Sequence, residues 1–246
     1  MQWGFMSPAH IISLVLAVAI VIVSHFVLSR CSQKVQLLIL RIFSFTGVIS
    51  VLVHLCCLGS PLENLPLHLC SFNAMVLPIV VFTKNKTLGN LLLVWCLGAL
   101  AALILNNEVA HYPLFSWTVF RFYVPHVVEL AIPILMFTLG HIKKDPKCIV
   151  STILITMTIY TLVHFANVAL TDYINTNNIV NPDGNPIVPN YMFSMVATNP
   201  LLELFQKILP GRYWHMYLAV PIVVVYLCIV YFPEILRGIK NKKAKG

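Results

Sequence analysis

The sequence contains few charged residues. Asp, Glu, Lys and Arg together make up 10% of its 246 residues, whereas hydrophobic residues make up 59%. Soluble domains contain roughly 25% charged residues, so this composition excludes an ordinary soluble fold. The net charge of +8 does not indicate a nucleic-acid partner, because the basic residues flank long apolar stretches, where membrane topology accounts for them. We therefore predict an all-α, polytopic membrane protein.

The sequence also lacks the short motifs that identify common enzyme classes. It contains no HExxH, no GxSxG and no phosphate-binding P-loop. Its seven cysteines include no CxxC pair, and its histidines show no local metal-ligand spacing, so we predict no metal site and no cofactor. No internal repeat is visible, which leaves the inverted-repeat plan of many transporters without support.

Apolar stretches divide the chain into seven expected membrane spans. A helix needs about 20 apolar residues to cross the hydrocarbon core of a bilayer. The expected spans are Pro8–Leu28, Ile42–Leu58, Leu67–Phe82, Leu88–Asn106, Trp117–Leu139, Ile149–Leu170 and Tyr213–Phe232. The third stretch is short, and the Leu65-Pro66 dipeptide before it favours an irregular start.

Basic residues predict the orientation of these spans. Thirteen of the sixteen Lys and Arg residues follow spans one, three, five and seven, at positions 30, 34, 41, 84, 86, 143, 144, 147, 237, 240, 242, 243 and 245. Positive residues concentrate on the cytoplasmic side, so we predict an N-terminus outside and a cytoplasmic C-terminus. The whole chain, 1–246, then forms a single transmembrane helical bundle domain with a long outer loop at 171–212 and a basic cytoplasmic tail at 237–246.

The outer loop is the one long connection between the expected spans. NPDGNP (181–186) is rich in turn-forming residues, whereas PNYMF (189–193) and NPLLELF (199–205) supply aromatic and apolar side chains. A loop of this length is uncommon unless it is functional or disordered. Its apolar content favours a lid over the outer face of the bundle.

Polar residues gather at one expected depth, in the outer half of the spans. They are His68, Cys70 and Asn73 in the third span, Arg121, His126 and Glu129 in the fifth, His164 and Asn167 in the sixth, and Asn190 and Tyr191 in the outer loop. Polar residues inside a membrane usually face the bundle interior and are functional candidates. For each residue taken alone a structural role stays open: Arg121 and Glu129 would pair with each other or with nearby groups and tie the bundle together, and Cys70 would be a packed thiol.

These residue types are those that nucleophilic catalysis uses. A cysteine reacts as a thiolate and needs an adjacent base, which His126 on another span would supply. His68 lies two residues from Cys70, about 200° around a helix, and so points away from it unless the segment starts irregularly. Glu129 or an asparagine would orient the imidazole ring, and Arg121 suits a phosphate or carboxylate.

Three segments together resemble a known family. LPLHLCSFN (65–73), FRFYVPHVVEL (120–130) and NYMF (190–193) are similar to the YwaF-like integral membrane family, which includes the eukaryotic transmembrane protein 164, described as a glycerophospholipid acyltransferase. The resemblance extends from Leu65 to the end of the seventh span and is greatest with bacterial-type members. It implies acyl transfer through a cysteine acyl-enzyme, with Cys70 as nucleophile and His126 as base. His68, Arg121, Asn190 and Tyr191 match motif positions without an assigned role.

Two hypotheses follow. The first is a membrane-embedded acyltransferase or lipid acyl hydrolase that acts on glycerophospholipids through a Cys/His site, with membrane phospholipid as its substrate and the bacterial plasma membrane as its location. The alternative is a seven-helix small-molecule binding or transport protein without catalysis. The sequence leaves open the acyl donor and acceptor, the oligomeric state, and whether His68 or His126 is the base.

Overall fold

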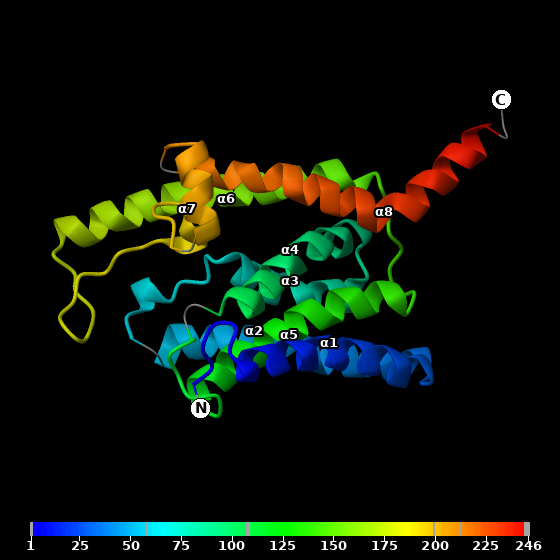
Figure 1. The fold of residues 1–246 in the computed structure, drawn as a ribbon, viewed down its shortest axis with the longest axis horizontal. Coiled ribbons are helices and arrows are strands. Elements are labelled where there is room, and N and C mark those ends of the chain that lie inside the picture. Colours follow the sequence, from blue (N-terminus) through cyan, green and yellow to red (C-terminus); the bar gives the residue numbers. More distant parts are fainter. Residues whose placement is uncertain (1, 58, 107–108, 199, 212, 244–246) are drawn as a thin grey trace. The chain divides into compact units, whose positions relative to one another are not determined.

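The computed structural model is built from helices joined by turns and short 3₁₀ segments (Figure 1), and it describes residues 2–57, 59–106, 109–198, 200–211 and 213–243. The α-helices are α1 (Pro8–Ser29), α2 (Gln33–Cys57), α3 (Leu69–Thr83), α4 (Lys86–Leu105), α5 (Trp117–Thr138), α6 (Cys148–Thr176), α7 (Pro200–Ile208) and α8 (Ala219–Lys243). The 3₁₀ segments are η1 (Pro61–Glu63), η2 (Tyr191–Phe193) and η3 (Trp214–Leu218).

Six helices in the described part of the chain are long and apolar enough to cross a membrane. They are α1, α2, α4, α5, α6 and the continuous segment Trp214–Arg237. These six match six of the seven predicted spans. The third predicted span corresponds to α3, which has 15 residues and is therefore about 22 Å long, shorter than a hydrocarbon core of about 30 Å. The count of seven spans stays a prediction.

Several helix ends differ from the predicted ends. α3 begins at Leu69 rather than Leu67, because Pro66 has no N–H and favours an extended residue before it, and this confirms the irregular start. α2 begins at Gln33, nine residues before the predicted start at Ile42. The Gln36 amide there donates to the backbone oxygens of Leu28 and Cys31, which secures the polar first turns of α2.

The predicted outer loop and tail are also partly helical. α6 continues to Thr176, so the first six residues of the predicted 171–212 loop are helical. α8 continues to Lys243, so most of the predicted 237–246 tail belongs to a helix. Residues 58, 199, 212 and 244–246, which the predictions for the second span, the loop and the tail include, lie outside the described part.

The chain divides into two compact units. Unit 1 comprises Met1–Val53 and Leu69–Lys143, and unit 2 comprises His54–His68 and Lys144–Gly246. The organisation of the whole chain as one bundle stays a prediction.

Unit 1 is a helical core in which the N-terminal segment packs against α5. The indole of Trp3 is completely buried and donates to Ser13 of α1, with an Nε1–Oγ distance of 2.8 Å. The Tyr123 hydroxyl of α5 donates to the Ser13 carbonyl at 2.7 Å, and the His10 ring lies 2.8 Å from the Leu103 carbonyl of α4. Because α3 also packs against α4 and α5, residues of α3 and α5 are brought together.

Unit 2 joins α6, the loop that follows it and α8. Tyr160 of α6 donates to the carbonyl of Tyr213, and Thr161 shares a hydrogen bond with Tyr217 of η3. The short helix α7 is amphipathic, since Leu202 and Phe205 are buried while its opposite face is exposed. The part of the chain predicted to be a lid therefore forms ordered structure with an apolar face.

Candidate functional site

The predicted site residues fall into two clusters, one in each unit. Unit 1 contains Cys70, Asn73, Arg121, His126 and Glu129, and unit 2 contains His68, His164, Asn190 and Tyr191.

Cys70 lies in the first turn of α3 and is half-buried. Its neighbour Leu69 packs on Gly98 of α4, where a Cβ atom would lie 3.1 Å from Cδ2 of Leu69. A glycine at this position lets the start of α3 approach α4 closely. The thiol is thereby held at the N-terminal end of a helix, where the helix dipole favours negative charge.

The His126 ring on α5 is fixed by a backbone carbonyl. Its Nδ1 atom lies 2.6 Å from the carbonyl oxygen of Phe122, and the centroids of the His126 and Phe122 rings are 4.4 Å apart. A carbonyl oxygen only accepts, so Nδ1 bears the hydrogen, and in the neutral ring Nε2 is the acceptor nitrogen. The Phe122 carbonyl thus helps to orient this ring, and an orienting role for Glu129 or an asparagine stays a prediction.

Asn73 and Glu129 lie where α2, α3 and α5 meet. Asn73 is completely buried and donates from Nδ2 to the Glu129 carbonyl at 3.4 Å. Glu129 is 3% exposed, and its carboxylate lies beside Gly47 of α2, where a Cβ would be 3.2 Å from Oε1. Within the described residues, Asn73 Oδ1 and Glu129 Oε2 have no hydrogen-bond partner. The pair therefore lines a buried helix junction.

Arg121 lies two turns before Glu129 on α5. Eight residues correspond to about 12 Å along the helix, and the described structure contains no ion pair between them. The Nη1 atom of Arg121 is buried and has no hydrogen-bond partner among the described residues. A direct ion pair between Arg121 and Glu129 is thus absent from the described residues, whereas their pairing with other nearby groups stays a prediction. One guanidinium nitrogen of Arg121 retains a donor for such a group.

In unit 2, the segment before α3 is joined to the NYMF turn. The Tyr191 hydroxyl accepts from the Leu65 N–H at 3.1 Å and donates to the Leu62 carbonyl at 2.5 Å. The Met192 N–H donates to Nδ1 of His68 at 3.4 Å, and the His68 and Tyr191 rings lie 5.3 Å apart in an edge-on arrangement. Because Nδ1 of His68 is an acceptor, Nε2 bears the hydrogen in the neutral ring.

The protonation of Tyr191 agrees with this arrangement. Burial raises the pKa of the Tyr191 phenol above its usual value, the carboxylate of Glu63 adds to the rise, and the hydrogen bond from Leu65 lowers it. The phenol therefore keeps its proton at neutral pH and remains a donor to Leu62.

The NYMF turn itself has an unusual backbone. Met192 and Phe193 have φ angles of 53° and 56°, in the left-handed region that side chains other than glycine rarely adopt. Asn190 accepts from the N–H groups of Met195 and Val196, both at 3.1 Å. Hydrogen bonds of Tyr191 therefore tie the turn to Leu62 and Leu65, and hydrogen bonds of Asn190 tie it to the residues that follow.

The model of the TMEM164 family matches residues 5–231. The chain belongs to the TMEM164 family. The match includes the first two helices, so it is wider than the resemblance from Leu65 onward. No curated protein and no solved structure shows a significant match. Family membership and six apolar helices together make the chain a multi-pass membrane protein.

In this TMEM164 family member, two further residues hold the NYMF turn that no sequence pattern indicated. Ser194 is completely buried, with its Oγ 3.2 Å from Nδ1 of His164, and His215 approaches the Phe193 carbonyl through Nε2 at 3.1 Å. Asn167, by contrast, was indicated by the sequence, since it lies three residues after His164 on the same face of the sixth predicted span. Ser194 and His215 follow no pattern that sequence spacing reveals.

Proposed function

We propose that this TMEM164 family member is a membrane acyltransferase or lipid acyl hydrolase that acts on glycerophospholipids through Cys70 and His126. The observation that supports it is the bond from His126 Nδ1 to the Phe122 carbonyl, which directs the basic character of the ring to Nε2. A cysteine nucleophile needs such a base. Further support comes from the packing of α3, which bears Cys70 in its first turn, against α5.

The proposed reaction has two acyl transfers. Nε2 of His126 takes the Cys70 proton, and the thiolate attacks the ester carbonyl of a glycerophospholipid. The thioester C–S bond forms, the ester C–O bond breaks, and His126 returns the proton to the leaving lysophospholipid hydroxyl. An acceptor hydroxyl, or water in the hydrolase, then gives its proton to His126 and attacks the thioester. The new C–O bond forms, the C–S bond breaks, and His126 returns the proton to the Cys70 thiolate.

The other predicted residues have supporting roles in this proposal. His68 is the less suitable base, because its Nδ1 lone pair already accepts from Met192. Arg121 offers a guanidinium donor to the lipid phosphate. His164, Asn190 and Tyr191 hold the NYMF turn, whereas Asn73 and Glu129 line the junction of three helices.

We also infer the topology from the basic residues. Seven crossings, with the N-terminus outside and the C-terminus cytoplasmic, agree with the concentration of Lys and Arg after alternate spans. In this arrangement α3 and the non-helical residues before it cross together, and Cys70 lies in the outer half of the bundle. The location we propose is the bacterial plasma membrane.

The test is a search for a covalent acyl-enzyme. Purified wild-type protein, Cys70→Ala and His126→Ala are incubated with mixed phospholipids, and the intact mass of each protein is measured. We expect a fatty-acyl adduct on wild type, none on Cys70→Ala, and adduct formation slowed about 10²–10⁴-fold in His126→Ala. Cys228→Ala, which removes an exposed thiol of α8, is the matched control and should keep the adduct.

The opposite result distinguishes the alternative function. If equally stable wild type and Cys70→Ala both lack an adduct and leave the lipids unchanged, the acyl-enzyme mechanism is wrong. Saturable uptake of a small molecule into liposomes, unaffected by Cys70→Ala, would then favour the seven-helix binding or transport protein.

A further inference from the structure

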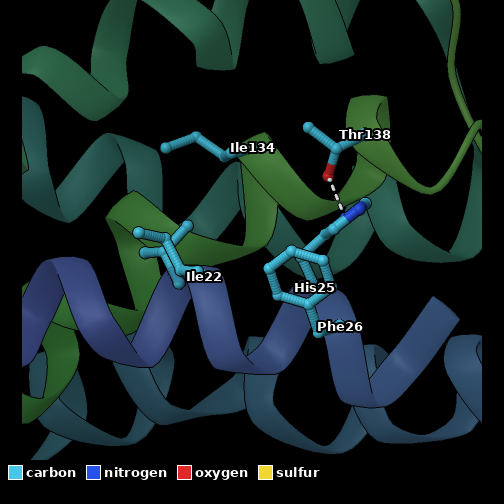
Figure 2. Close-up of a pocket in the computed structure, with 6 residues that line it drawn as sticks. Ile22, His25, Phe26, Ile134 and Thr138 are labelled. Atoms are coloured by element: carbon cyan, nitrogen blue, oxygen red, sulfur yellow. Dashed lines mark hydrogen bonds between the residues drawn. The ribbon is translucent and has the colours of Figure 1, made fainter.

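A groove runs between the last turns of α1 and α5 in unit 1 (Figure 2). It is lined by Val21, Ile22, His25, Phe26, Ile134 and Thr138. The His25 ring is turned toward Thr138, with Nδ1 and Oγ1 3.1 Å apart, and the remaining lining is aliphatic or aromatic. An apolar groove with one polar pair in its lining suits a lipid, whose acyl chain and headgroup are joined by polar ester groups.

Two exposed basic residues follow the groove-lining residues of α1 in the chain. Arg30 caps the C-terminus of α1 and is exposed. It follows Phe26 by four residues, about one helical turn, directly after the end of α1. Lys34 is exposed in the first turn of α2, after the short turn that follows Arg30. Basic pockets between membrane helices at this end of a bundle bind anionic headgroups.

We propose that this groove binds an anionic phospholipid from the leaflet on the basic side of the membrane. One acyl chain lies along Ile22, Phe26 and Ile134, the ester region meets His25 and Thr138, and the phosphate pairs with Arg30. Ile22 and Phe26 are 50% and 61% exposed, so their outer surfaces are open to lipid.

The groove is separate from the proposed Cys/His site. Thr138 follows His126 by twelve residues, about 18 Å along α5. The proposal therefore goes beyond the acyl-transfer reaction, and it adds a resident lipid that is bound rather than converted.

The experiment uses the full-length protein reconstituted in phosphatidylcholine vesicles. Phosphatidylglycerol and phosphatidylcholine probes with a photoreactive acyl chain are added at equal mole fraction, and labelled peptides are identified by mass spectrometry. We expect the peptides of the last turns of α1 and α5 to be labelled about fivefold more by the phosphatidylglycerol probe. Arg30→Gln should abolish this preference, whereas Lys86→Gln, a matched charge removal at the start of α4, should retain it.

A second pair of variants tests the groove itself. Ile22→Trp fills it and should reduce labelling to that of the phosphatidylcholine probe. Val15→Trp is the control, because it lies two turns earlier on the same face of α1 and is 64% exposed. Equal labelling of wild type by both probes, or labelling that Ile22→Trp leaves unchanged, would mean ordinary boundary lipid and would overturn the proposal. Cys70→Ala should label as wild type does, so this result does not depend on the proposed catalysis.

Discussion

The side-chain amide of Asn167 is paired with the backbone of Tyr191 in both directions. Its Nδ2 donates to the Tyr191 carbonyl at 2.8 Å, and its Oδ1 accepts from the Tyr191 N–H at 3.1 Å. Nδ2 also donates to Ser194 at 2.8 Å. The Asn167 side chain of α6 thus bonds the backbone N–H and C=O of Tyr191 as a neighbouring strand would. These hydrogen bonds offset the backbone strain at Met192 and Phe193.

Asn167→Ala should destabilise the protein strongly. The substitution removes three hydrogen bonds and leaves buried backbone groups of Tyr191 unpaired, at a cost of about 2–4 kcal/mol. The measurement is the unfolding free energy in mixed micelles. Asn177→Ala is the control, since it removes a single hydrogen bond at the exposed C-terminus of the same helix and should cost less than about 1 kcal/mol. Equal losses of unfolding free energy in the two variants would show that the hydrogen bonds of Asn167 do not stabilise the NYMF turn.

Gly47→Ala should destabilise unit 1 through a clash between α2 and α3. A Cβ at position 47 would lie 2.7 Å from the Ala74 Cβ and 3.2 Å from Glu129 Oε1. Forcing these helices apart costs about 1–3 kcal/mol. Ala74→Gly removes the opposing methyl group, so the double variant should recover much of the loss. A thermal unfolding comparison of the four proteins measures the coupling, and additive effects would show that the two positions do not meet.

Glu129→Gln should leave stability unchanged or raise it by about 1 kcal/mol. The carboxylate is buried and its Oε2 lacks a hydrogen-bond partner in the described structure, so a neutral amide of the same shape has a smaller desolvation cost. Chemical unfolding of wild type and variant measures the difference. The exposed Glu203→Gln of α7 serves as the control and should shift stability by less than about 0.5 kcal/mol. A large loss in Glu129→Gln would mean that the negative charge itself is needed.

His141 should contribute to a loss of stability at acidic pH. Burial, and then the positive charge of Lys84, hold the pKa of His141 below its usual value. As pH falls below about 6.5, the unfolded chain therefore binds a proton before the folded chain does, and stability decreases until the lowered pKa is reached. His141→Gln should flatten this part of the pH profile of thermal unfolding, and Lys84→Gln should flatten it partly. An unchanged profile in His141→Gln would assign the acid sensitivity to other groups.

The sequence by itself determined where most helices lie. The apolar runs predicted α1 and α5 to within a residue at each end, and in the structure Ser7 and Ser116 cap these helices where the runs begin. The irregular start of α3 was also predicted from Pro66. Such signals are local: a cap, a proline and a run of apolar residues act within a few positions of the chain.

Only the tertiary structure decided how the polar residues are used. The sequence placed Arg121, His126 and Glu129 in one helix, but the ring orientation of His126 depends on the Phe122 carbonyl, and the environment of Glu129 depends on Gly47 of a different helix. Asn167 and Tyr191 are 24 positions apart, and their pairing requires a left-handed turn that no local pattern predicts. Hydrogen bonds select a tautomer and a partner by distance in space, which a linear sequence does not contain.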